Sequence, residues 1–366
     1  MKILGIETSC DDTAMAVIEV QSEKRKVKSG EKIMVSSNII SSQVKLHAKY
    51  GGVVPNLAAR EHAKNIGHVF DLALEKAGIK NFKKEIDAIA VTRGPGLGPA
   101  LLVGISFAKT ISWIYKKPLV GVNHLEGHIY SNWLPPIGIN SNLKFLIFKK
   151  EPALNLIVSG GHTELVLMRG IGDYKLIGET LDDAVGEAFD KVARLLGLGY
   201  PGGPALAQRA SKFKVESSKL KVPILFPRPM IHSKDYNFSF SGLKTAVLYK
   251  IRDLKNAGAV LTDSVVNEIA HAFQEAAIDV LITKTIRAAR KFNAKSIFLS
   301  GGVSANKLLR ERLEKAVRKH GLNYSQPPLA YTGDNAAMIA IAGYFNCKKN
   351  RRDSLKPVQM DANLTF

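Results

Sequence analysis

Short hydrophobic runs separated by polar turns open the chain, and a longer amphipathic segment follows them. The short runs favour strands, whereas Pro55–Ala77 repeats apolar residues at i, i+3 and i+4, which predicts a helix. A glycine-rich turn at 94–98 then begins a second helix. The elements expected in this half are strands Lys2–Glu7, Met15–Val20 and Ile33–Ile40, a helix Pro55–Ala77, a strand Ile86–Val91 and a helix through Trp113.

The second half repeats this order of elements. Its expected elements are strands Asn155–Val158 and Glu164–Met168, joined by a turn at 159–163, and later a strand Ser296–Leu299, a turn at 300–302 and a helix Ala305–Lys319. Such a repeat predicts a duplicated α/β fold of the ribonuclease-H type, as in actin, Hsp70 and the sugar kinases. In that fold two lobes enclose a nucleotide cleft, and glycine turns present backbone N–H groups to phosphates.

The repeat also predicts the domain boundaries. We expect an N-terminal actin-like lobe at 1–123 and a C-terminal actin-like lobe at 124–345, the latter with an insertion around 180–255. A basic C-terminal tail follows at 346–366. The first strand begins almost at Met1, so no signal or transit peptide is expected, and no apolar run is long enough to span a membrane. We therefore expect a cytoplasmic protein, and the presence of only two cysteines agrees with a reducing compartment.

The chain is strongly basic. Its 366 residues include 52 Lys and Arg against 32 Asp and Glu, a formal net charge of +20. This balance fits either a solvated lysine-rich surface or a polyanionic partner such as nucleic acid. No recognition helix or zinc finger indicates a sequence-specific DNA-binding protein. The basic residues concentrate in the stretches 24–32, 144–150, 212–221, 284–295 and 348–356.

Two histidines form the clearest chemical signal. His124 and His128 are four residues apart, so a helix places both rings on one face, where they can bind one metal ion. Asp334 is the candidate third ligand, although it is equally suited to cap the helix that follows it. Glu126 lies about 200° around the helix from His124, which argues against a protease of the His-Glu-x-x-His type. We expect the metal to bridge the two halves of the protein.

Several segments together resemble one known family, the tRNA threonylcarbamoyladenosine transferases (TsaD), formerly described as sialoglycoproteases. The segments are Ile6–Thr13, His124–His128, Val158–Thr163, Asp182–Lys191, Tyr200–Gly203, Phe238–Lys244, Ser300–Asn306 and Thr332–Asn335. The Glu-Thr-Ser-Cys-Asp opening is similar to the bacterial and organellar branch. Alternatives are a small-molecule kinase or ATPase of the actin fold and a non-catalytic nucleotide-binding subunit.

The resemblance implies a reaction and a set of site residues. A threonylcarbamoyl group passes from threonylcarbamoyl-AMP to the N6 amine of the adenosine 3′ to the tRNA anticodon, and AMP leaves. The family's divalent metal, iron(II) or zinc, would be bound by His124, His128 and Asp334. The residues implied to bind substrate are Val158, Ser159, Gly160, Gly161 and His162 at the phosphate or threonylcarbamoyl arm, Asp190 and Gly203 at the ribose, and Asn306 at the base.

The roles of two aspartates depend on how much weight the resemblance receives. Read alone, Asp190 is a solvated helix residue that pairs with Arg194 at i, i+4. Asp11 is either a turn residue or a functional group, which accepts the proton of the attacking amine or orients a neighbouring site residue. The resemblance also implies partners: tRNA, a smaller paralogous subunit (TsaB-like) and an ATPase subunit (TsaE-like).

Overall fold

The computed structural model describes residues 1–23, 30–142, 151–213, 223–349 and 357–366. Tertiary contacts divide the chain into two compact units. Unit 1 comprises Met1–Lys149, Gly170–Gly172 and Pro327–Phe366, and unit 2 comprises Lys150–Arg169 and Asp173–Gln326. Most of the basic stretches at 24–32, 144–150, 212–221 and 348–356 lie outside the described residues. Within the described part, no helix is long and apolar enough to cross a membrane.

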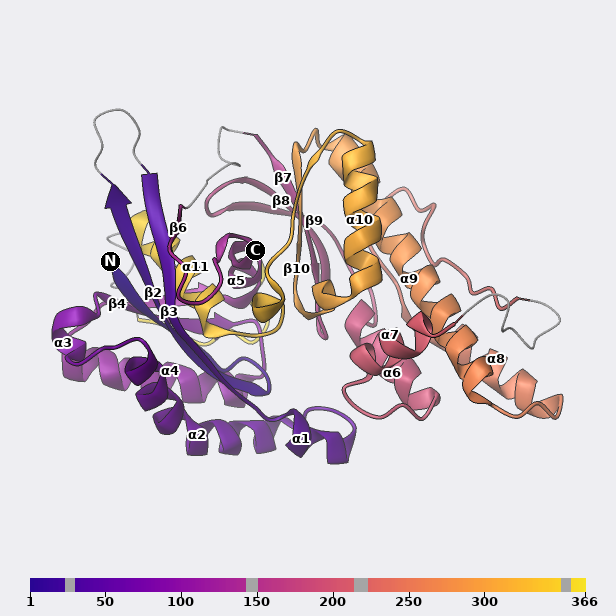
Figure 1. The fold of residues 1–366 in the computed structure, drawn as a ribbon, viewed down its shortest axis with the longest axis horizontal. Coiled ribbons are helices and arrows are strands. Elements are labelled where there is room, and N and C mark those ends of the chain that lie inside the picture. The colour runs from indigo at the N-terminus through magenta and orange to yellow at the C-terminus, as the bar shows by residue number, and fades with distance from the viewer. Residues whose placement is uncertain (24–29, 143–150, 214–222, 350–356) are drawn as a thin grey trace. The chain divides into compact units, whose positions relative to one another are not determined.

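Unit 1 is built on a six-stranded sheet with the order β5-β4-β1-β2-β3-β6 (Figure 1). Its strands are β1 Lys2–Glu7, β2 Asp12–Glu23, β3 Gly30–Ser42, β4 Ala88–Gly94, β5 Leu119–Asn123 and β6 Ser141–Asn142. Its helices are α1 Val44–His47, α2 Pro55–Lys76, α3 Phe82–Glu85, α4 Gly98–Tyr115, α5 His124–Tyr130 and α11 Ala336–Lys349. Strand β1 pairs antiparallel with β2 and parallel with β4.

Alternation along β1 directs its side chains to two different helical layers. Leu4 and Ile6 belong to the hydrophobic cluster that includes residues of α2 and α4. Gly5 lies on the other face, where an added Cβ would come within 2.2 Å of the Ala336 carbonyl oxygen. Because successive strand residues point to opposite faces, α2 and α4 cover one face of the sheet and α11 covers the other. Helix α11 begins two residues after Asp334, so this packing fixes the position of that carboxylate.

Unit 2 is built on a five-stranded sheet with the order β11-β10-β7-β8-β9 (Figure 1). Its strands are β7 Ala153–Val158, β8 Thr163–Gly170, β9 Asp173–Glu179, β10 Ser296–Ser300 and β11 Asn323–Ser325. Its helices are α6 Val185–Leu195, α7 Gly202–Ser211, α8 Ser241–Asn256, α9 Asp263–Lys291 and α10 Lys307–Lys319. Strand β7 pairs antiparallel with β8 and parallel with β10, as β1 does with β2 and β4. The duplication expected from the sequence is therefore confirmed at the level of strand order.

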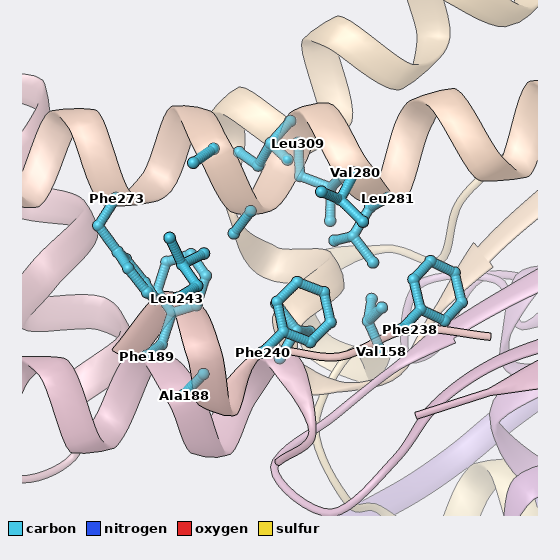
Figure 2. Packing of buried hydrophobic residues seen from close by; sticks show 14 of the residues in the cluster. Val158, Ala188, Phe189, Phe238, Phe240, Leu243, Phe273, Val280, Leu281 and Leu309 are labelled. Atoms are coloured by element: carbon cyan, nitrogen blue, oxygen red, sulfur yellow. The ribbon is translucent and has the colours of Figure 1, made fainter. Parts of the chain in front are cut away.

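Successive side chains of the Phe-Ser-Phe-Ser segment before α8 lie alternately in the hydrophobic core and in a polar network. Phe238 and Phe240 are buried with ring centroids 6.2 Å apart, in the cluster shown in Figure 2. Ser239 and Ser241 donate to the carboxylate of Asp182, which also accepts the backbone N–H groups of Phe240 and Ser241. This aspartate thus binds the start of α8, and the motif has a structural role.

The units differ from the lobes expected from the sequence. Residues 327–345 were expected in the second lobe, but α11 packs on β1, β2, β4 and β5 of the first sheet and belongs to unit 1. The described end of the chain also belongs to unit 1, because Val358 is buried in its core. The region around 180–255, expected to be an insertion, contains α6, α7 and most of α8.

Candidate metal centre and nucleotide pocket

The two histidines lie on the short helix α5. Asn123 begins this helix by accepting the backbone N–H of Leu125 at 2.9 Å. The Nε2 atoms of His124 and His128 each lie 3.4 Å from Oδ1 of Asp334. The three candidate ligand atoms all lie within 4.8 Å of one another. The structure therefore brings together the three residues that the sequence selected as metal ligands.

Asp334 is not the cap of the following helix. Asn335 has this role, because its Oδ1 accepts the backbone N–H of Met338 at 3.0 Å. The carboxylate of Asp334 is therefore available to a metal ion. Its position also corrects the expectation of a metal bridging the two halves, because His124, His128 and Asp334 all belong to unit 1.

The glycine inside the His-Leu-Glu-Gly-His segment allows α5 to approach α11. A Cβ on Gly127 would lie 2.9 Å from Cδ1 of Ile339 and 3.2 Å from Cγ of Met338. Glu126, in contrast, is bound by the side-chain amide of Asn346 at 3.2 Å. This contact agrees with the prediction that Glu126 does not act on the metal site.

Glu7 supports the metal site and was not selected from the sequence. It is fully buried at the end of β1, and Nδ1 of His124 donates to its Oε2 at 2.9 Å. Thr92 donates to the same oxygen at 2.6 Å, and the backbone N–H of Ser9 donates to Oε1. Because Glu7 accepts the proton on Nδ1, Nε2 of His124 faces Asp334 and can coordinate a metal ion that displaces the proton on Nε2.

The protonation states of the three candidate ligands suit the binding of a metal cation. Burial opposes charge on His124, but Glu7 and Asp334 raise its pKa well above the usual value. Burial would likewise raise the pKa of Asp334, but His124 and His128 hold it well below the usual range. Burial lowers the pKa of His128, so this imidazole is neutral. The site therefore offers an ionised carboxylate and a neutral imidazole, together with a histidine whose proton a metal ion would displace.

The donor set and its spacing fit a metal ion. Both ring nitrogens of His128 are buried and have no hydrogen-bond partner among the described residues. Ligand atoms around a tetrahedral ion with arms of about 2.1 Å lie about 3.4 Å apart, close to the two separations from Asp334. Two imidazoles and one carboxylate suit iron(II) or zinc, and three ligands leave a position open for substrate.

Unit 2 contains a separate pocket of about 490 Å³. Of the residues expected to bind substrate, Gly160, Asp190, Gly203 and Asn306 line it. Val158, Ser159, Gly161 and His162 are not among its lining residues. Ser159 and His162 instead shape the turn between β7 and β8, since the backbone N–H of Ser159 donates to the carbonyl of His162 at 2.8 Å.

Comparison with known proteins identifies the family. The family model described as TsaD, tRNA N6-adenosine threonylcarbamoyltransferase, matches residues 34–341, a range that includes His124, His128 and Asp334. The chain belongs to this family. The assignment confirms the resemblance found in the motifs and favours acyl transfer over the kinase alternative.

Curated relatives with this name match almost the whole chain. The tRNA N6-adenosine threonylcarbamoyltransferase of Persephonella marina is 49% identical and covers 96% of this chain and 91% of its own length. That of Thermomicrobium roseum is 50% identical, with coverages of 97% and 94%. That of Bacillus subtilis is 47% identical, with coverages of 96% and 92%.

Solved structures support the fold. HypF from T. kodakarensis matches with a TM-score of 0.57 at 16% identity, over 97% of this chain and 48% of that chain. A phosphate- and nucleotide-bound full-length HypF matches with a TM-score of 0.56 at 13% identity, over 97% of this chain and 56% of that chain. These matches and the two equivalent sheets agree with the expected duplicated actin-like fold.

Within this family member, Asp190 is a partly buried acceptor and differs from the solvated residue that its own sequence context predicted. Its Oδ1 accepts the backbone N–H groups of Gly202 and Gly203 at 2.8 and 2.9 Å, at the start of α7. Burial raises its pKa even though these two bonds oppose the shift. Asn306 is also held in place, because it caps α10 and donates to Gln274 at 2.8 Å.

The second glycine turn, at 300–302, borders the pocket and has a backbone conformation that only glycine adopts readily. Gly301 has φ +88°, and a Cβ there would lie 2.3 Å from the Val158 carbonyl oxygen. Only glycine fits both the conformation and the close approach. Gly302, the next residue, lines the pocket and has open space around its Cα. The two turns expected to bind a nucleotide thus each contribute a glycine to the pocket wall, Gly160 and Gly302.

Asp11 and Asp12 lie at the turn that leads from β1 into β2. Burial, reinforced by Asp334, raises the pKa of Asp11. Burial raises that of Asp12 to about 7. Burial and the neighbouring Asp11 raise the pKa of Cys10 well above its usual value, which agrees with a packed thiol and argues against a nucleophile. Imidazole Nε2 of His62 fixes the turn, because it lies 2.9 Å from the Cys10 carbonyl oxygen.

Replacing Glu7 with glutamine should weaken metal binding by about ten- to a hundredfold. The carboxylate accepts hydrogen bonds on both oxygens. An amide would place its NH₂ group against one of the hydrogen-bond donors. The metal affinity is measured by competition with a chelating dye. Glu126→Gln is the matched control, because it makes the same carboxylate-to-amide change at a buried residue that does not contact the three candidate ligands. Equal affinities in the two variants would contradict the supporting role of Glu7.

Proposed function

We propose that this chain transfers the threonylcarbamoyl group of threonylcarbamoyl-AMP to the N6 amine of the adenosine 3′ to the tRNA anticodon. The amine nitrogen forms a bond to the carbamoyl carbon, the bond from that carbon to the phosphate oxygen breaks, and AMP leaves with the electron pair. The amine loses one proton. The family assignment supports the reaction class, and the observation that carries the site is the His124–His128–Asp334 cluster.

The pocket of unit 2 is the proposed site for the adenylate part of the donor. Asp190 and Gly203 would bind the ribose, and Asn306 would lie at the base. The turn 158–162 would present its backbone N–H groups to the phosphate or the threonylcarbamoyl arm. Gly160 supports this role, because it lines the pocket and no other atom lies within 4 Å of the position of an added Cβ.

The ligand set of unit 1 is the proposed metal site. His124, His128 and Asp334 would hold one iron(II) or zinc ion, oriented by Glu7. When bound, such an ion supplies a Lewis acid for a substrate oxygen. Asp11 is the proposed acceptor of the amine proton. Burial and Asp334 raise its pKa, which brings the carboxylate closer to the range of an effective general base.

The setting of the reaction is also proposed from the family. The proposed location is the cytoplasm, where tRNA is available as substrate. A smaller paralogous subunit (TsaB-like) and an ATPase subunit (TsaE-like) are the proposed protein partners. The test incubates the purified chain, with and without these subunits, with threonylcarbamoyl-AMP and unmodified tRNA. Nucleoside analysis should detect threonylcarbamoyladenosine, and its absence in both reactions would refute the proposal.

A Gly160→Val substitution should weaken AMP binding by about tenfold or more without unfolding the protein. The new side chain enters open space at the pocket wall, and Gly160 does not need a left-handed backbone. A loss of this size corresponds to one or two lost contacts of ordinary strength. Titration calorimetry measures the affinity, and a melting curve checks the fold.

Gly67→Val serves as the control for this substitution. Gly67 also has open space at the position of an added Cβ, but it is an exposed residue of α2 in unit 1 and does not line the pocket. Its replacement should therefore have the smaller effect. Wild-type affinity in the Gly160→Val protein would show that the nucleotide does not occupy this pocket.

A further inference from the structure

A groove rich in positive charge lies between the last turns of α9 and the end of α10, within unit 2. Its volume is about 710 Å³, and its basic residues are Arg287, Arg290, Lys291, Lys319 and His320. None of the other described residues that line it is acidic. The two helices lie side by side in Figure 1. The groove is distinct from the pocket that contains Asp190.

Three of these cations are not neutralised by the protein. Arg290, Lys291 and Lys319 are exposed and form no ion pair with any residue in the described part of the chain. By contrast, Arg312 and Arg318 on α10 each bind carboxylates at 2.6 Å. The groove therefore concentrates positive charge that the fold itself does not use.

Arg287 gives the groove one fixed cation. Its guanidinium donates to the carbonyl oxygens of Ile231 and Asp235 and lies 5.2 Å from the centre of the Tyr236 ring. Bonds to carbonyl oxygens orient the group without cancelling its charge. A guanidinium that is already oriented loses less conformational entropy when it contacts an anion.

One helix connects the groove to the pocket. Helix α10 begins at Lys307, which lines the pocket, and ends at Lys319, which lines the groove. At 1.5 Å per residue the two ends are about 18 Å apart. A large polyanion whose acceptor nucleotide reacts with a donor bound in this pocket can therefore place other phosphates at the groove.

We propose that the α9–α10 groove docks the phosphate backbone of tRNA at a distance from the reacting adenosine. The proposal rests on the proposed function, which makes tRNA the substrate. Unpaired Lys and Arg displace counterions from phosphates, and folded RNA is recognised largely through its shape and backbone. Docking at the groove is independent of base sequence, because its polar contacts come from cations and not from groups arranged to distinguish bases.

The test compares two variants that each lose three positive charges. The groove variant carries Arg290→Ala, Lys291→Ala and Lys319→Ala. The control variant carries Lys76→Ala, Lys83→Ala and Lys84→Ala, which are exposed residues of α2 and α3 in unit 1. Dissociation constants for unmodified tRNA are measured by filter binding over a range of salt concentrations. Melting curves and AMP titrations establish that both variants are folded.

The groove variant should bind tRNA about tenfold or more weakly, and its slope of log affinity against log salt should fall by about two to three. The loss should be similar for tRNAs with different anticodons. A groove variant that binds as tightly as the control variant overturns the docking surface and leaves the proposed reaction intact. A wild-type chain that neither binds tRNA nor modifies it, with or without partner subunits, overturns the proposed function itself.

Discussion

A His128→Ala protein should remain folded, bind no metal and lose about a thousandfold of its transfer activity. Losing a Lewis acid that stabilises developing charge by several kcal/mol corresponds to a rate loss of about this size. The stability cost should be modest, a shift of a few degrees in melting temperature, because the described residues give the His128 ring no closer polar contact than Asp334 Oδ1, 3.4 Å from Nε2.

Elemental analysis, a melting curve and the transfer assay on one preparation provide the measurement. His68→Ala is the control, because His68 is an exposed histidine of α2 and is not part of the metal site. His124→Ala should also lose the metal, but it additionally leaves the buried Glu7 without its imidazole partner. A His128→Ala protein that lacks metal but transfers at the wild-type rate would exclude a catalytic metal. An unfolded one would indicate that the metal is structural.

An Asp11→Asn protein should keep its metal and lose about a hundredfold or more of its transfer rate at saturating substrate. A positioned general base contributes about 10²- to 10⁴-fold, and an amide cannot accept the proton. The metal should remain, because Asp11 is not among the residues of the ligand cluster. The rate should fall mainly in kcat, since the proton is transferred in the chemical step.

The pH dependence gives an independent check on Asp11. A base must be ionised, so wild-type activity should fall as the pH drops through the pKa of Asp11. Burial raises that pKa, which places the loss above the usual value of 3.8. Asp12→Asn is the matched control, being the neighbouring acid in the same turn. If Asp12→Asn loses more activity than Asp11→Asn, the proton acceptor is Asp12, whose pKa burial raises to about 7.

The order and type of most elements follow from local patterns in the sequence. The amphipathic spacing of Pro55–Ala77 predicts α2, which spans Pro55–Lys76, because side-chain periodicity depends only on the local backbone. The i, i+4 spacing of His124 and His128 likewise places both rings on one helical face before any tertiary contact is known. The repeated order of strands and glycine turns is sufficient to predict the duplicated fold.

Tertiary contacts decide the features that join residues distant in sequence. Glu7 supports His124 across a separation of 117 residues, and no local pattern indicates this pairing. The packing of α11 on the first sheet places Asp334 in unit 1 beside the histidines, whereas the expected boundary placed all three residues in the second lobe. Asp190 binds the start of α7 because the chain folds back onto α6, a contact that the i, i+4 spacing to Arg194 does not predict.

The sequence by itself therefore determined the family, the repeated fold and the three candidate metal ligands, because each depends on motifs or on short-range periodicity. Tertiary structure alone decided which carboxylate contacts the candidate ligand His124, which residue caps α11 and where unpaired cations converge. These depend on burial and on contacts between distant segments. The groove is the clearest case, because the basic stretch 284–295 gained significance only when the end of α10 was placed beside it.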